Sequence, residues 1–146
     1  MYNMGVIVNI EDKSYVVILQ CDIVMERCSG YFCEKSFNER EGGCSVYPKD
    51  KKLRSIYMTC GGCCGRATHR KMSHLIRRLR EKEDIHREHI VVQLASCMTL
   101  DNYHSSPCPH LDYIKGLLDK LDVDHMENTH IDKTSESLRH SGKYKS

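Results

Sequence analysis

Residues 53–80 read LRSIYMTCGGCCGRATHRKMSHLIRRLR, which has the pattern of a strand, a glycine-rich turn and a helix in succession. The run LRSIYMT is typical of a strand, whereas the apolar residues after Arg66 recur at helical spacing. In the turn, Cys60 and Cys63 are separated by two glycines, and Cys64 follows at once. Two thiols with this spacing can chelate one metal ion or form a small disulfide. The segment therefore predicts a strand–turn–helix unit with the chain's chemistry in its turn.

The rest of the chain also alternates strand and helix patterns. The predicted strands are residues 15–20, 53–59, 90–95 and 123–130, and the predicted helices are residues 29–40, 66–83 and a third that starts at Pro109. This alternation predicts an α/β fold of three layers, with a mostly parallel four-stranded sheet and helices on both faces. The first and third strands are almost purely apolar and are expected at the centre. The predicted strand order is 2-1-3-4, which is flavodoxin-like.

Each predicted helix has an apolar face. In the first, Ser29 is expected to be the N-cap, with Phe32 and Phe37 facing inward. The apolar faces of the second and third helices consist of Met72, Leu75, Ile76 and Leu79, and of Leu111, Ile114, Leu117, Leu118 and Leu121.

The chain of 146 residues is long enough for one domain with its own core. We expect this domain to span residues 15–131. Residues 1–14 are either an N-terminal extension or, between Met4 and Ile10, an extra strand. Residues 132–146 are polar and are expected to form a flexible tail.

Composition excludes several classes of partner. The 22 Lys and Arg nearly balance 20 Asp and Glu, and the basic face of helix 66–83 is typical of a solvated surface, so no nucleic acid is expected as a partner. The longest apolar runs are too short to cross a membrane, and no secretory signal is visible. These features predict a cytoplasmic protein. In that reducing compartment, nine cysteines favour metal ligation or redox chemistry over a disulfide framework.

A cysteine or histidine, both of which are candidate metal ligands, follows each of the four predicted strands. Cys21, Cys60, Cys97 and His130 come after the first, second, third and fourth strand. Because the carboxyl ends of parallel strands lie at one edge of a sheet, we expect these donors to lie close together. Four further candidate donors, in the loops and at the starts of helices, are Cys28, Cys33, Cys108 and His110.

Five blocks in this order resemble the CGGC domain, a small family that has been suggested to bind metal. They are CSGYFC at 28–33, TCGGC at 59–63, LASC at 94–97, PCPH at 107–110 and NTH at 128–130. The residues that match the family pattern are Cys21, Cys28, Cys33, Cys60, Cys63, Cys97, Cys108, His110 and His130. Cys44 and Cys64 look additional, and Cys64 is an alternative to Cys63 as a ligand.

Two hypotheses remain for the site. In the first, Cys21, Cys60, Cys63 and Cys97 bind a metal, which is either a zinc ion or an iron-sulfur cluster. The other matching cysteines and histidines are second-choice ligands. In the alternative, Cys60 and Cys63 carry out thiol–disulfide exchange, helped by the dipole of the following helix and by the positive potential of Arg66, His69 and Arg70. The sequence identifies a metal ion as the expected partner, names no partner protein or small molecule, and leaves open whether the chain is an enzyme.

Overall fold

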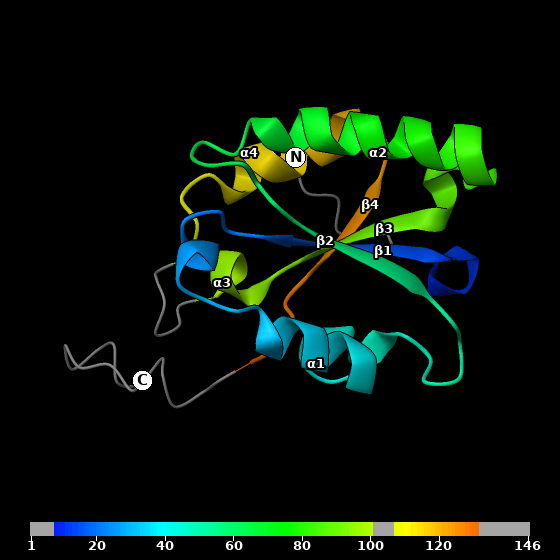
Figure 1. The fold of residues 1–146 in the computed structure, drawn as a ribbon, viewed down its shortest axis with the longest axis horizontal. Coiled ribbons are helices and arrows are strands. Elements are labelled where there is room, and N and C mark those ends of the chain that lie inside the picture. The colour runs from blue at the N-terminus through cyan, green and yellow to red at the C-terminus, as the bar shows by residue number, and fades with distance from the viewer. Residues whose placement is uncertain (1–7, 101–106, 132–146) are drawn as a thin grey trace.

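The computed structural model describes residues 8–100 and 107–131, in which a four-stranded parallel sheet lies between two layers of helices (Figure 1). The strands are β1 (Tyr15–Gln20), β2 (Arg54–Thr59), β3 (Ile90–Leu94) and β4 (Asp124–Glu127). The α-helices are α1 (Tyr31–Glu39), α2 (Ala67–Glu83), α3 (Ser96–Thr99) and α4 (Leu111–Lys120). Four short 3-10 helices, η1 (Ile10–Asp12), η2 (Val24–Glu26), η3 (Gly42–Val46) and η4 (Arg87–His89), lie in the connections.

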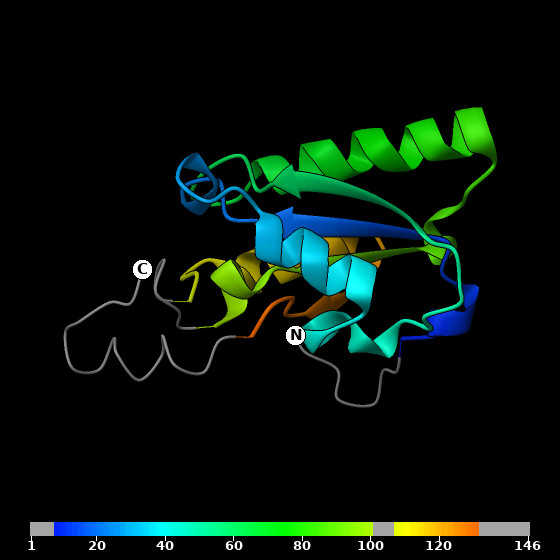
Figure 2. The same ribbon diagram turned by 60° about the horizontal axis from the view of Figure 1, so that its bottom comes forward.

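The strand order is β2-β1-β3-β4, and every neighbouring pair is parallel. The predicted α/β class, the parallel sheet and the order 2-1-3-4 are therefore confirmed, while likeness to flavodoxin stays a prediction. Gln20 pairs with Thr59 on the last rung that β1 and β2 share. In Figure 2 the arrowheads of β1 and β2 point to the same end of the molecule, where the connections gather. That end is the carboxyl edge.

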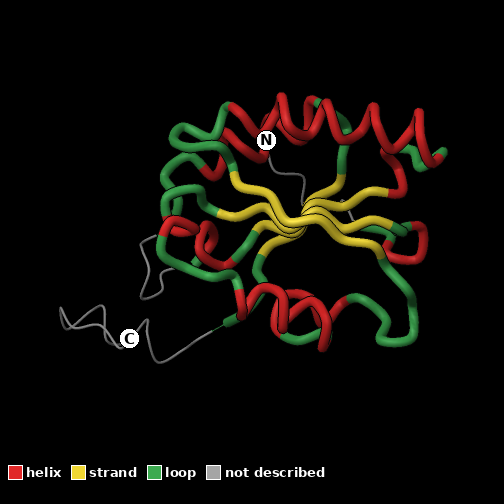
Figure 3. Tube along the Cα trace, viewed as in Figure 1, coloured by secondary structure: helices red, strands yellow, loops and turns green. Residues whose placement is uncertain are grey.

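Alternate residues of the central strands face two separate hydrophobic cores. Val17, Leu19 and Val92 pack with α2 and α4 on one face. Val16 and Ile18 pack with α1 and η3 on the other face. The central strands are buried on both faces, as their apolar sequences predict. Figure 3 shows the strands between the two helical layers.

Three details at the starts of helices differ from expectation. Phe32 does not face inward and is 42% exposed, whereas Phe37 is buried. At 3.6 residues per turn, five positions correspond to a rotation of roughly 140°, so the two rings cannot share one face. Gly30, not Ser29, occupies the N-cap of α1, although the Ser29 hydroxyl accepts a hydrogen bond from the N–H of Tyr31. The last helix begins at Leu111 rather than Pro109, because residues 109 and 110 form a turn.

Both ends of the chain extend past the described residues. Of the expected extra strand between Met4 and Ile10, residues 4–7 lie outside the described ranges, and Ile10 lies in η1. Val8 and Ile10 pack against the core beside η3. The expected tail, residues 132–146, lies outside the described ranges, as do residues 101–106. Within the described ranges, no helix has the length and apolar character needed to cross a membrane.

Candidate functional site

The loops after β1 and β2 bring their cysteines together because the two strands end on the same rung. Cys21 and Cys60 directly follow the paired residues Gln20 and Thr59, and the N–H of Cys60 donates to the carbonyl of Gln20 (3.0 Å). The Thr59 hydroxyl donates to the Asp22 carboxylate (2.6 Å). These hydrogen bonds fix the start of both loops at the carboxyl edge.

Cys97 lies next to Cys21. It is the second residue of α3, and its Sγ accepts a hydrogen bond from the N–H of Cys21 (3.4 Å). The pKa of the Cys97 thiol is raised to about 12, first by burial and then by the nearby thiols of Cys33, Cys21 and Cys28. The hydrogen bond from Cys21 acts in the opposite direction. Cys97 is therefore a largely buried thiol in contact with the start of the loop after β1.

Cys108 packs against the same core as Cys21 and Cys97. Its N–H donates to the carbonyl of Met98 (2.8 Å), which holds the start of α4 against α3. Burial raises the pKa of Cys108, and the thiols of Cys21, Cys60 and Cys63 add to this effect. Seven cysteines match the family pattern and follow β1, β2 or β3 in the chain, and we call them the carboxyl-edge thiols: Cys21, Cys28, Cys33, Cys60, Cys63, Cys97 and Cys108.

The two histidines among the candidate donors make other contacts. The ring of His130 stacks on Phe32, with ring centroids 4.3 Å apart and planes at 18°. His110 is the N-cap of α4, and its backbone N–H donates to the Sγ of Cys108 (3.4 Å). The geometry therefore gives more support to the cysteines than to the histidines as ligands.

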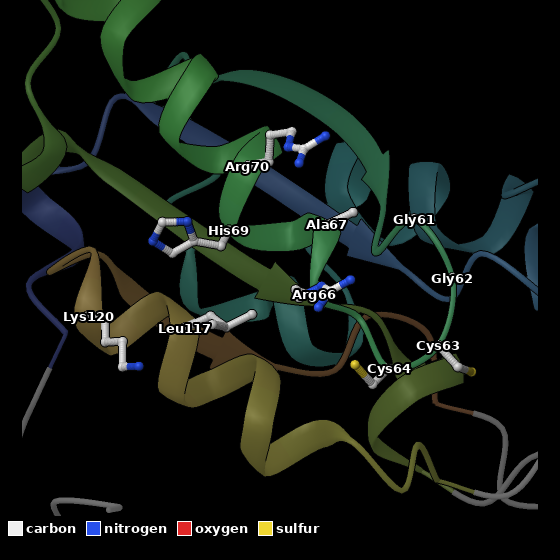
Figure 4. A pocket seen from close by; sticks show the side chains of 10 residues that line it. All are labelled: Gly61, Gly62, Cys63, Cys64, Arg66, Ala67, His69, Arg70, Leu117 and Lys120. Atoms are coloured by element: carbon white, nitrogen blue, oxygen red, sulfur yellow. The ribbon is translucent and has the colours of Figure 1, made fainter.

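The two cysteines that look additional differ in their surroundings. Cys44 is the buried residue of η3 and packs in the core, and burial raises the pKa of its thiol. Its role there is packing. Cys64 is exposed, and Figure 4 shows its sulfur pointing to the side of Leu117 while the sulfur of Cys63 points away. Of the adjacent pair, Cys63 is the one that affects the pKa of Cys108.

A hollow of about 600 Å³ lies beside the thiols, between the start of α2 and α4. Its lining consists of Gly61, Gly62, Cys63, Cys64, Arg66, Ala67, His69, Arg70, Leu117 and Lys120 (Figure 4). The sequence identifies Arg66 and Arg70 as positive charge near the cysteines. It does not place Lys120 there, because the last turn of α4 reaches this hollow only through tertiary packing.

Another residue that the sequence analysis missed is Thr129. This buried residue forms a hydrogen bond with Cys33 (Sγ to Oγ1, 3.3 Å) and exchanges two hydrogen bonds with Ser96. Thr129 thereby connects the segment after β4 to α1, through Cys33, and to α3, through Ser96. Thr129 belongs to the block NTH, so the motif contained a signal that was attributed to His130 alone.

Cysteine thiols are suitable ligands for a soft metal ion, but the described side chains are not arranged around one point where an ion could bind. All nine cysteines are free of disulfides. Over residues 8–100 and 107–131, no three or more Cys, His, Asp or Glu side chains are arranged to hold a metal ion. Of the donors predicted to gather at this edge, Cys21 and Cys97 are in contact through the hydrogen bond from the Cys21 N–H to the Cys97 Sγ. The assignment of particular ligands stays a prediction.

Comparison with known proteins gives one family. Residues 15–130 match the CGGC domain, which covers all seven carboxyl-edge thiols. Neither a curated protein nor a solved structure matches the chain significantly.

Proposed function

Because the chain belongs to the CGGC domain family, we propose that it binds a metal ion through thiols at the carboxyl edge of its sheet. The observation that carries this proposal is the position of Cys21, whose N–H contacts the Sγ of Cys97 (3.4 Å) and which packs against the same core as Cys97 and Cys108. Thiolates are strong ligands for zinc and for iron in clusters. Cys44 is an example of a cysteine whose role in this fold is packing. We do not expect packing alone to account for the seven carboxyl-edge thiols.

The preferred ligands are Cys21, Cys60, Cys63 and Cys97, and the preferred metal is zinc. An iron-sulfur cluster is the other candidate metal group. Because the side chains do not surround one point, binding requires some of them to rotate about their Cα–Cβ bonds. The cytoplasm is the compartment that we expect, since it would keep the thiols reduced.

The first experiment is anaerobic purification without a histidine tag, followed by elemental analysis and an absorption spectrum. Zinc at about one ion per chain in a colourless protein would support the preferred metal. Iron with acid-labile sulfide and visible absorption would instead assign a cluster. Folded protein that contains no metal, and takes up none under reducing conditions, would refute metal binding.

Adjacent cysteines offer a matched pair of variants for the ligand assignment. We expect Cys63→Ser to reduce the affinity for metal at least about tenfold, and Cys64→Ser to change it less than about twofold. Both side chains are exposed, so neither change should disturb the core. Metal content and thermal stability should fall together in Cys63→Ser, because metal binding is linked to folding. Equal loss of metal in both variants would contradict the assignment of Cys63 over Cys64.

The alternative function is thiol–disulfide exchange by Cys60 and Cys63. A nucleophilic thiol must be accessible and gains reactivity at a helix N-terminus. Cys60 is only 5% exposed, and α2 begins at Ala67, beyond both cysteines. The geometry therefore gives this alternative less support. Disulfide reductase activity that disappears in Cys63→Ser while metal content is unchanged would favour it.

A further inference from the structure

The segment around the CGGC turn has an unusual distribution of charge. Residues 51–80 contain no Asp or Glu, although the whole chain has 20 acidic residues and a net charge of only +2. Three of the positive or titratable side chains in this segment, Arg66, His69 and Arg70, lie at the start of α2. Their spacing of i, i+3 and i+4 places them on one face of the helix. The basic residues are therefore concentrated next to the turn.

These three residues line the same hollow as Lys120. Arg66, His69 and Arg70 come from α2, and Lys120 is the last residue of α4. Among the described residues, none that lines the hollow is acidic. In Figure 4 Leu117 lies between the two helices, while His69 and Arg70 extend from α2 in different directions and Lys120 lies on α4. Two separate elements thus contribute cationic residues to the lining of one hollow.

In the described part of the chain, these four side chains form no hydrogen bond or ion pair. Other cations of α2 do have partners: Lys71 donates to the carbonyl of Thr59, and Arg78 pairs with Glu81. Cations near a helix N-terminus are also opposed by the helix dipole, which favours negative charge there. Within residues 8–100 and 107–131, the positive charge of the hollow is therefore not compensated by a contacting acidic side chain.

We propose that this hollow binds a small phosphate-bearing molecule or inorganic phosphate. Two guanidinium groups can form charge-assisted, bidentate hydrogen bonds with phosphate oxygens, and Lys120 adds a further charge. The hollow of about 600 Å³ is larger than phosphate itself. Leu117 also lines the hollow but is only 7% exposed, so the proposed binding rests on the cationic side chains. None of the four cationic side chains is a proposed metal ligand, although the hollow shares Cys63 with the metal proposal.

The test is a calorimetric titration, in which inorganic phosphate is added to the reduced full-length chain at constant ionic strength. We expect saturable binding of one phosphate per chain. The double variant Arg66→Gln/Arg70→Gln should weaken it at least about tenfold, because it removes both guanidinium groups. The matched control is Arg77→Gln/Arg80→Gln, which removes the same charge from exposed positions of α2 outside the hollow. The control should change affinity less than about twofold.

A second readout uses the thiols at the rim. Bound phosphate should slow alkylation of Cys64, whose sulfur points to the side of Leu117, and leave alkylation of Cys63 nearly unchanged. Absence of saturable binding, or equal weakening in both double variants, would overturn the proposal. Metal content measured in the same samples separates this result from the metal proposal, since the arginine variants should retain metal.

Discussion

The hydroxyl of Tyr47 donates a hydrogen bond to Oε1 of Gln93 (2.7 Å), and both side chains are buried in or beside the central strand β3. The amide nitrogen of Gln93 donates in turn to the carbonyl of Asn128 (2.6 Å). One polar side chain in a strand of otherwise apolar residues thus connects η3 with the segment after β4. That segment carries Thr129, which contacts the thiol of Cys33.

We expect Tyr47→Phe to lower the free energy of unfolding by about 1–3 kcal/mol, because it leaves Oε1 of Gln93 buried without a donor. Chemical denaturation would measure the change. Tyr113→Phe is the matched control, since that side chain is 43% exposed, and it should stay within about 0.5 kcal/mol of the unaltered chain. An equal effect of the two substitutions would show that the buried hydrogen bond does not stabilise the fold.

The burial of an individual residue was predictable from the sequence where the periodicity of its own helix or strand determines which way it faces. Phe37 faces the core because its helix has an apolar face, and the same helical periodicity should have excluded Phe32 from that face. By contrast, the burial of Cys44 depends on η3 folding back onto the sheet, and the stacking of Phe32 on His130 joins residues far apart in sequence. No local pattern contains such contacts.

At the scale of elements, glycines set how closely the CGGC turn approaches α4. Gly62 and Gly65 both have positive φ values, 109° and 89°. A Cβ at Gly65 would lie 2.6 Å from the side chain of Ile114, whereas a Cβ at Gly62 would meet nothing within 4 Å. Ile114 is fully buried and cannot easily move. Gly65 therefore serves both backbone conformation and packing.

This difference predicts unequal effects of two alanine substitutions. Gly62→Ala should cost about 1 kcal/mol of stability, from backbone strain alone. Gly65→Ala should cost about 1–3 kcal/mol more, because it also crowds Ile114. Thermal or chemical unfolding of both variants would give the comparison. A smaller cost for Gly65→Ala than for Gly62→Ala would contradict the close contact between the turn and α4.

The strands were more predictable than the helix starts. Residues 15–20 and 90–95 are apolar on both faces, which only a central parallel strand requires, and this pattern also determines which strands are edges. The start of a helix depends on a few hydrogen bonds of its preceding turn. Gly30, with φ of +84°, and His110 therefore replaced Ser29 and Pro109 at the helix boundaries.

For the molecule as a whole, buried acidic groups predict a loss of stability at high pH. Burial raises the pKa of Tyr47 and of Cys44 above their usual ranges, and the pKa of Cys97 is raised to about 12. Between about pH 9 and pH 12 these groups ionise in the unfolded chain before they ionise in the folded chain. Stability should therefore be complete below about pH 9 and decrease as pH rises, by up to about 1.4 kcal/mol per pH unit and group.

Urea denaturation of metal-free, reduced protein from pH 7 to pH 11 would measure this decrease. Tyr47→Phe is the control, because it removes one of the ionising groups and should reduce the slope above about pH 10. Stability that stays constant up to pH 11 would contradict the burial of these groups.

The overall architecture and the gathering of thiols at one edge followed from the order of strands and the positions of Cys21, Cys60 and Cys97. The topology places the ends of parallel strands together regardless of details. The orientation of each sulfur depends on side-chain torsions and on loops, which the sequence does not encode locally. The opposite directions of the sulfurs of Cys63 and Cys64 are one example, and the contribution of Lys120 to the hollow is another.

The graded exposure of the cysteines has a practical consequence. Cys63 and Cys64 are at the surface, Cys60 is nearly covered, and Cys44 is fully enclosed on the opposite face of the sheet. The chain therefore carries native chemical probes at several depths and on both sides of the sheet. Mass spectrometry of alkylated peptides could record which segment opens first, without any introduced label.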